Sequence, residues 1–109
     1  MAGDPAPSKH PLGSVDRLVH EPARLLILSQ LFVIDACDFL FMQTQTGLTK
    51  GNLSSHLAKL EDAGYVEIVK EFQDKRPRTL LRLTASGREA FSTHVASLRR
   101  WINDVPDAN

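Results

Sequence analysis

The segment that begins at Thr46, TGLTKGNLSSHLAKLEDAGY, limits most narrowly how this chain can fold. Three leucines in it recur at positions i, i+4 and i+7: Leu53, Leu57 and Leu60. This spacing places them on one side of an amphipathic helix. Thr49 is suited to cap the start of that helix, and Gly64 is suited to end it. The segment therefore predicts a helix over about residues 49–63 with a leucine stripe facing the core.

A second, shorter helix is predicted immediately before this one. In the preceding run DFLFMQTQTG, Asp38 can act as the N-cap and Gly47 as the residue that ends the helix. A three-residue turn, Gly47 to Thr49, then joins the two helices. Two helices joined by so short a turn form a helix-turn-helix.

The side of the second helix that faces away from the leucines carries small and polar residues instead of strong helix formers. At 100° per residue this side presents Gly51, Asn52, Ser55, Ala58 and Lys59. A helix that enters a DNA major groove about 12 Å wide needs such a face, and its first N–H groups can bind a phosphate. We therefore predict DNA contacts from Thr49, Lys50, Gly51, Asn52, Ser54, Ser55 and Lys59. The alternative is an ordinary solvent-facing helix surface.

A β-hairpin is predicted next. YVEIVKEF and TLLRLT alternate in polarity as half-buried strands do, with Val66, Ile68, Leu81 and Leu83 inward and Phe72 as a further candidate. The intervening QDKRPR, residues 73–78, is predicted to be a turn. Its basic residues are Lys75, Arg76 and Arg78. A basic loop beside a groove-reading helix can hold the flanking DNA backbone or the minor groove.

Two further helices flank these elements. The first is predicted over Pro22–Ile34, with proline in the first turn. The last follows the capping residue Thr84 and extends over about residues 85–103, or about 28 Å. Residues 35–37 are too few to decide whether another strand precedes the short helix. The fold class is α+β and mostly helical: a winged helix-turn-helix with three helices, a two-stranded wing and a long C-terminal helix.

The length of 109 residues suits one domain. We predict a flexible tail over residues 1–15, which contain three prolines and two glycines, a domain over 16–103, and a short tail over 104–109. No apolar run approaches the roughly 20 residues of a membrane helix, and no signal peptide is evident. A single cysteine, Cys37, fits a reducing compartment. We therefore expect a cytoplasmic protein.

The combination TGLTKGNLSSHLAKLEDAGYVEIVKEF, RPRTLLRLTASGREAF resembles the small winged-helix transcriptional regulators of the MarR/ArsR-like class. The resemblance covers about residues 19–98. It implies a homodimer that binds double-stranded DNA, with the 49–63 helix as recognition helix and residues 73–78 as wing. Two positions depart from the usual pattern: His56 replaces an apolar residue, and Gln43 stands where a small residue is usual.

The end of the last helix carries apolar residues that a compact winged helix does not reach, namely Leu98, Trp101 and Ile102. Exposed residues of this kind mark contacts, so we predict that they form a dimer interface with the N-terminal helix. Leu40 and Phe41 leave two readings open. They bury the short helix on a second side, or they line a pocket or an interface.

Other functions find little support in the sequence. Nothing basic adjoins Cys37, the histidines have no metal-ligand spacing, and no phosphate loop or catalytic arrangement is present. We therefore predict no enzyme activity, no metal and no cofactor. Whether a small-molecule effector exists is unknown from the sequence. The rival to DNA binding is a winged helix used for protein–protein contact, which the zero net charge and Glu61 and Asp62 keep open.

Overall fold

The computed structural model describes residues 16–106. The predicted 1–15 tail and the last three residues of the predicted C-terminal tail lie outside this range. The described elements, in chain order, are α1 (Pro22–Ile34), β1 (Ala36–Asp38), α2 (Phe39–Thr46), α3 (Lys50–Asp62), β2 (Val66–Gln73), β3 (Arg76–Leu83) and α4 (Ala85–Asp104). The predicted α+β winged helix-turn-helix is confirmed, and α4 ends one residue later than predicted.

The ends of the helices are fixed by the capping residues that the sequence predicts. The side chains of Asp38, Thr49 and Thr84 each accept a hydrogen bond from a backbone N–H in the first turn of the helix that follows. Gly47 ends α2 in the left-handed conformation, with φ of 70°. These local signals set the spacing of α2 and α3 before tertiary packing contributes.

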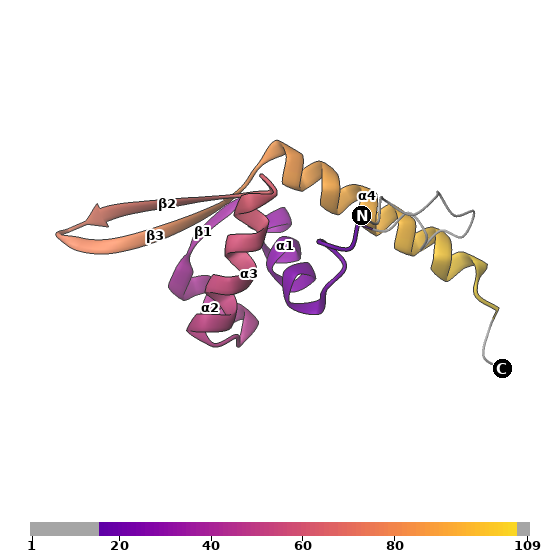
Figure 1. Ribbon diagram of the computed structural model, residues 1–109, viewed down its shortest axis with the longest axis horizontal. Coiled ribbons are helices and arrows are strands. Elements are labelled where there is room, and N and C mark those ends of the chain that lie inside the picture. The colour runs from indigo at the N-terminus through magenta and orange to yellow at the C-terminus, as the bar shows by residue number, and fades with distance from the viewer. Residues whose placement is uncertain (1–15, 107–109) are drawn as a thin grey trace, which may run out of the picture.

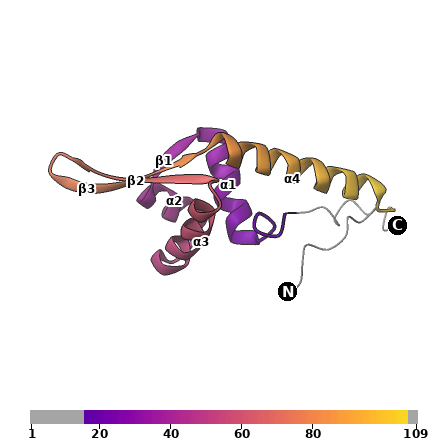
Figure 2. The same ribbon diagram turned by 45° about the horizontal axis from the view of Figure 1, so that its top comes forward.

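The sheet has three antiparallel strands in the order β1-β3-β2. The short strand that the sequence left undecided is β1, which pairs with β3. The β2–β3 ladder extends from Val66 opposite Leu83 to Gln73 opposite Arg76. Beyond the end of β1 this hairpin continues alone and projects from the helices (Figures 1 and 2).

The predicted turn over residues 73–78 is wrong in extent. The turn consists of Asp74 and Lys75, whose φ values are 52° and 66°, and Arg76, Pro77 and Arg78 belong to β3. A two-residue turn with both φ values positive matches the twist of the paired strands better than a longer loop. Pro77 is tolerated in β3 because β1 covers that strand only as far as Leu80, which leaves one edge open.

The hydrophobic core lies between α1, α2, α3 and one side of the sheet. Its buried members are Val19, Ile27, Leu28, Leu31, Met42, Leu53, Leu57, Leu60, Val66, Leu81 and Leu83. We call the side of the hairpin that faces this core the inner face; it carries Val66, Ile68, Lys70 and Phe72 from β2 and Pro77, Thr79, Leu81 and Leu83 from β3. The other side is the outer face.

Two predictions about burial are wrong. Phe72 lies on the inner face but is 78% exposed, because the hairpin has passed beyond the helices at that point. Leu40 and Phe41 do not bury α2 on a second side: Leu40 is 72% exposed and Phe41 43% exposed. Met42 is the one residue of α2 that is fully buried.

The start of α4 packs closely on the loop that precedes β2. The N–H of Thr84 donates to the carbonyl of Tyr65, and the Thr84 hydroxyl donates to the carbonyl of Gly64. A Cβ atom added at Gly87 would lie 2.1 Å from the Tyr65 carbonyl oxygen. No side chain fits there unless the backbone moves, so Gly87 is required by packing.

Replacing Gly87 with alanine should therefore destabilise the fold. We expect the free energy of unfolding to fall by about 2 kcal/mol, the usual scale for an overpacked site, despite the better helix propensity of alanine. Urea denaturation of the two proteins measures this difference. An unchanged midpoint would mean that α4 can shift away from Tyr65 without loss.

The side of α4 that packs on the rest of the chain is more polar than predicted. His94 and Ser97 are buried, whereas Phe91, Val95 and Leu98 are only half-buried. The His94 Nε2 lies 3.2 Å from Nδ1 of His20. Burial lowers the pKa of His94, the neighbouring His20 lowers it further, and Asp16 acts in the opposite direction. The neutral form of His94 is therefore the one that fits the folded chain.

This shift predicts a pH dependence of stability. Because the folded pKa of His94 lies below its ordinary value of 6.5, the unfolded chain binds more protons as pH falls. The free energy of unfolding is therefore highest above pH 6.5. It falls below that pH, by no more than about 1.4 kcal/mol per pH unit for one group. Urea midpoints measured from pH 7.5 to pH 5 should fall in the wild type and fall less in His94→Gln. Equal slopes would exclude His94 as the cause.

Candidate nucleic-acid interface

The helix-turn-helix is built by α2 and α3. Thr49 ends the turn, and its hydroxyl accepts the N–H of Asn52 at 3.1 Å. The N–H groups of Lys50 and Gly51, in the same first turn, have no partner within the helix, as at any helix start. The start of α3 can therefore receive an anion such as a phosphate.

A polar contact fixes the orientation of α3 against α1. The guanidinium of the buried Arg24 lies 3.2 Å from Nδ1 of His56, and a carboxylate oxygen of Glu21 lies 3.5 Å from the same atom. Arg24 also donates from Nε to the carbonyl of Leu18. His56 thus holds the flank of α3. No local pattern indicates its partners, which lie more than thirty residues away.

All predicted contact residues of α3 are exposed: Thr49, Lys50, Gly51, Asn52, Ser54, Ser55 and Lys59. They divide into two groups. Lys50 and Ser54 line a groove beside the helix, and the others lie outside it. A Cβ atom added at Gly51 would meet nothing within 4 Å, and this glycine has no positive φ. Neither packing nor backbone conformation therefore requires glycine at position 51.

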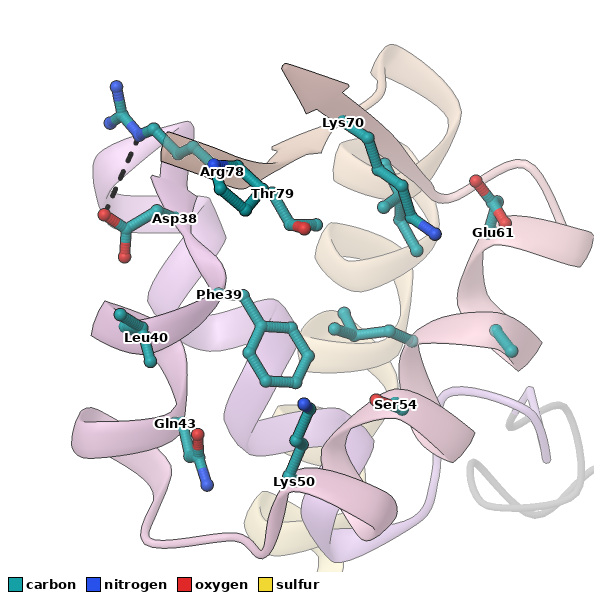
Figure 3. Close-up of a pocket in the computed structure, with 14 residues that line it drawn as sticks. Asp38, Phe39, Leu40, Gln43, Lys50, Ser54, Glu61, Lys70, Arg78 and Thr79 are labelled. Atoms are coloured by element: carbon teal, nitrogen blue, oxygen red, sulfur yellow. Dashed lines mark ion pairs between the residues drawn. The ribbon is translucent and has the colours of Figure 1, made fainter. Parts of the chain in front are cut away.

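The groove has a volume of about 870 Å³ and lies between α2, α3 and the inner face of the hairpin. Figure 3 shows Phe39 pointing into it, with Lys50 and Ser54 on the α3 side and Lys70 and Thr79 on the hairpin side. Leu40 and Gln43 line it from α2. The alternation that places Val66 and Ile68 inward also places Lys70 on this face, although the apolar pattern alone does not indicate it.

The basic residues of the wing are not equivalent. Arg78 is held by this chain: its guanidinium lies 3.8 Å from the carboxylate of Asp38 (Figure 3). The guanidinium also lies 3.8 Å from Glu71 and donates to Gln73 at 2.9 Å. Arg78 therefore lies in β3 and not in the predicted turn, and its guanidinium is already engaged within this chain. Lys75 in the turn and Arg76 beside it are exposed, and no ion pair to either is found within residues 16–106.

The long α4 extends away from the rest of the domain (Figures 1 and 2). Of the predicted interface residues, Ile102 is 61% exposed, whereas Leu98 and Trp101 are half-buried. On the body side of α4 the Phe91 ring lies 5.3 Å from that of Phe32, between ring centroids. The apolar stripe of α4 thus continues past the part of the helix that packs on α1.

Other kinds of site are weakly supported. Burial, and then the charge of Asp38, raise the pKa of the Cys37 thiol to about 11, which opposes the reactive thiolate. Within residues 16–106 no group of three or more possible metal ligands lies close together. No described helix is both long and apolar enough to cross a bilayer.

Residues 23–102 match the family of winged helix DNA-binding domains. The chain belongs to this family. It is 34% identical over 89 residues to an uncharacterized protein of Methanocaldococcus jannaschii. The alignment covers 82% of this chain and 97% of that protein. The family membership explains the exposed α3 and the projecting hairpin as parts of one DNA-binding fold.

Solved structures of transcriptional regulators share this fold. A transcriptional regulator homologue from Pyrococcus horikoshii OT3 has 34% sequence identity and a TM-score of 0.73, covering 90% of this chain and 92% of that chain. PcaV from Streptomyces coelicolor, solved with its natural ligand, has 24% identity and a TM-score of 0.69, covering 82% of this chain and 62% of its own. The chain therefore shares the winged-helix fold of these transcriptional regulators.

Proposed function

We propose that this protein is a homodimeric transcriptional regulator that binds specific sequences in double-stranded DNA. In this proposal α3 enters the major groove, and the wing, residues 73–78, contacts the flanking backbone or minor groove. The domain comprises residues 16–103, and the protein acts in the cytoplasm. No cofactor or metal is part of the proposal.

The observation that carries the proposal is Gly51 on an otherwise exposed and polar helix face. Glycine at this position weakens the helix by about 0.5 to 1 kcal/mol relative to alanine. Neither packing nor backbone geometry requires it. A surface that approaches α3 closely, such as the wall of a major groove, accounts for the absence of a side chain.

The dimer completes the proposed function. The distal residues of α4, Leu98, Trp101 and Ile102, would pack against a second copy together with its N-terminal helix. The two copies of α3 would then meet successive major grooves about 34 Å apart, and the operator would be a near-palindrome. A two-fold protein with one reading helix per copy requires two such half-sites.

Substitutions on α3 and on the wing should weaken DNA binding in different ways. Asn52→Ala or Ser55→Ala should reduce the preference for a specific site over random DNA by about 1–3 kcal/mol if the substitution removes a hydrogen bond to a base. Lys75→Ala with Arg76→Ala should weaken both kinds of binding equally. It should also reduce the slope of log affinity against log salt by about one for each phosphate that the wing no longer neutralises.

Fluorescence anisotropy with labelled duplexes over a salt series tests this division. Arg78→Ala is the matched control, because that arginine is already held by Asp38 and Glu71 and should change the salt slope least. Random-sequence duplex that fails to bind even at low salt would contradict the proposal. The winged helix would then serve protein–protein contact, which is the alternative function that the sequence leaves open.

A further inference from the structure

We infer that Phe72 and Pro77 form an apolar contact of the wing with the DNA minor groove next to the major groove that α3 occupies. This inference rests on the proposed function. It assigns to the wing a contact that is not electrostatic, and it moves the main contact from the predicted arginines to the inner face of the hairpin.

The position of the two residues is fixed by the strand register. Phe72 is directly opposite Pro77, on the inner face of the projecting part of the hairpin. The Phe72 side chain is 78% exposed, although this face covers the core closer to the helices. An exposed phenylalanine next to a proline at the end of a projecting hairpin is a surface suited to contact, and it contributes nothing to the core.

Three arginines, Arg76, Arg78 and Arg82, lie on the outer face of the hairpin, and the two nearer the helices are already paired with acids of this chain. Arg78 lies 3.8 Å from Glu71 and from Asp38, and Arg82 lies 3.7 Å from Glu67. Releasing either arginine for a phosphate would leave its carboxylate facing the DNA. The cross-strand ion pairs therefore occupy the side of the wing that composition alone makes most basic.

The charges around Phe72 favour a polyanion over an apolar protein partner. Lys70 shares the inner face, and Lys75 and Arg76 are exposed at the adjoining turn. The groove and the end of the hairpin together carry five cations and four carboxylates: Lys50, Lys70, Lys75, Arg76 and Arg78, and Asp38, Glu61, Glu71 and Asp74. Asp38 and Glu71 are both paired with Arg78, and the region is positive by one charge.

The position of the groove indicates how the inner face of the hairpin would be oriented toward bound DNA. It is bounded by Lys50 and Ser54 of α3 on one side and by Lys70 and Thr79 of the hairpin on the other (Figure 3). A duplex with α3 in its major groove presents the neighbouring phosphate strand to this space and the next minor groove to the end of the hairpin. Phe72 and Pro77 then meet the minor groove, about 6 Å wide, where apolar side chains pack on sugars or between base steps.

The contact has a consequence for sequence preference. Apolar side chains that press into the minor groove favour base steps that unstack easily, such as TA and CA/TG. The wing should therefore add a preference for such steps at the flank of each half-site. Lys75 and Arg76 alone would add none, because phosphate contacts carry no sequence information.

Phe72→Ala is the direct test, with Val69→Ala as the matched control. Val69 is an apolar residue on the outer face of the same strand and is 37% exposed. The probe is a fluorescently labelled random-sequence duplex at low salt. We expect Phe72→Ala to weaken binding about tenfold, on the scale measured when an aromatic side chain that packs on nucleic acid is removed. Val69→Ala should bind as the wild type does, and thermal denaturation should be unchanged in both.

A photoreactive p-benzoylphenylalanine placed at position 72 or at position 69 gives a second measurement on the same DNA. Cross-linking to DNA from 72 and not from 69 would support the inference. DNA binding without a cross-link from 72 would overturn the inference and leave the proposed function intact. Cross-linking from 72 to a second copy of the chain would overturn it in favour of a protein contact. If the wild type binds no DNA, the proposed function and this inference both fail.

Discussion

Gly51→Leu is expected to reduce operator affinity by roughly thirtyfold or more while the isolated protein becomes slightly more stable. A Cβ atom added at this position meets nothing within 4 Å in the free protein. In a DNA complex the leucine side chain would occupy the space between α3 and the groove wall. A steric conflict of about 1–3 kcal/mol in each of two half-sites gives an effect of this size.

Gly51→Leu should lower operator affinity but raise stability, and these opposite changes distinguish a lost DNA contact from a folding defect. Stability should rise by about 0.5 kcal/mol, the lower part of the range for replacing a helical glycine, because Gly51 lies in the first turn. Gly51→Ala is the graded control and should weaken binding less. Urea denaturation and anisotropy on the same preparations measure both quantities. Operator binding by Gly51→Leu at wild-type strength would mean that α3 does not approach DNA at this residue.

The second large effect is expected from Trp101→Ala combined with Ile102→Ala. If these residues hold two copies together, the variant should become monomeric at micromolar concentration. Each half-site would then be bound alone. Linked binding commonly exceeds single-site binding by roughly 10²–10⁴, so operator affinity should fall by about a thousandfold.

Val69→Ala serves as the control for removal of an exposed apolar side chain elsewhere on the surface. Circular dichroism should show that α4 remains helical in the double variant, although Trp101 is half-buried and its removal costs some stability. Light scattering measures the mass. A monomer mass for the wild type itself at micromolar concentration would refute the proposed interface.

Much of the fold could be predicted because its signals are local. Asp38, Thr49 and Thr84 cap the helices that they precede, and Gly47 ends α2 with a left-handed conformation. Such features depend on a few neighbouring residues and on side-chain hydrogen bonds to the backbone. The leucine stripe of α3 likewise needs only the period of the helix.

The predictions that were wrong depend on how elements distant in the sequence are placed relative to one another. Phe72 continues the inward alternation of β2, but the helices beneath the hairpin end before it. Arg78 was predicted in the turn, whereas it lies in β3, where the pairing of β1 with β3 brings Asp38, forty residues earlier, near it. Contacts of this kind depend on tertiary placement, which the local pattern does not encode.

The candidate site likewise has one part that the local sequence predicts and another part that depends on tertiary packing. The exposed face of α3 follows from helical geometry once the leucines are assigned to the core, and all seven predicted residues are exposed. The groove beside it combines Gln43, Lys50 and Lys70 from three elements, and no single segment predicts that grouping. Its assembly depends on the packing of α2 and α3 beneath the sheet.

Selection of bound duplexes from random DNA with the purified protein tests the central claim most directly. A sequence-specific homodimer should enrich a near-palindromic consensus whose half-sites are about one helical turn, or a simple multiple of it, apart. Gly51→Leu should fail to enrich that consensus under the same conditions. A wild-type pool that remains random after repeated rounds would contradict the claim that this winged helix reads DNA sequence.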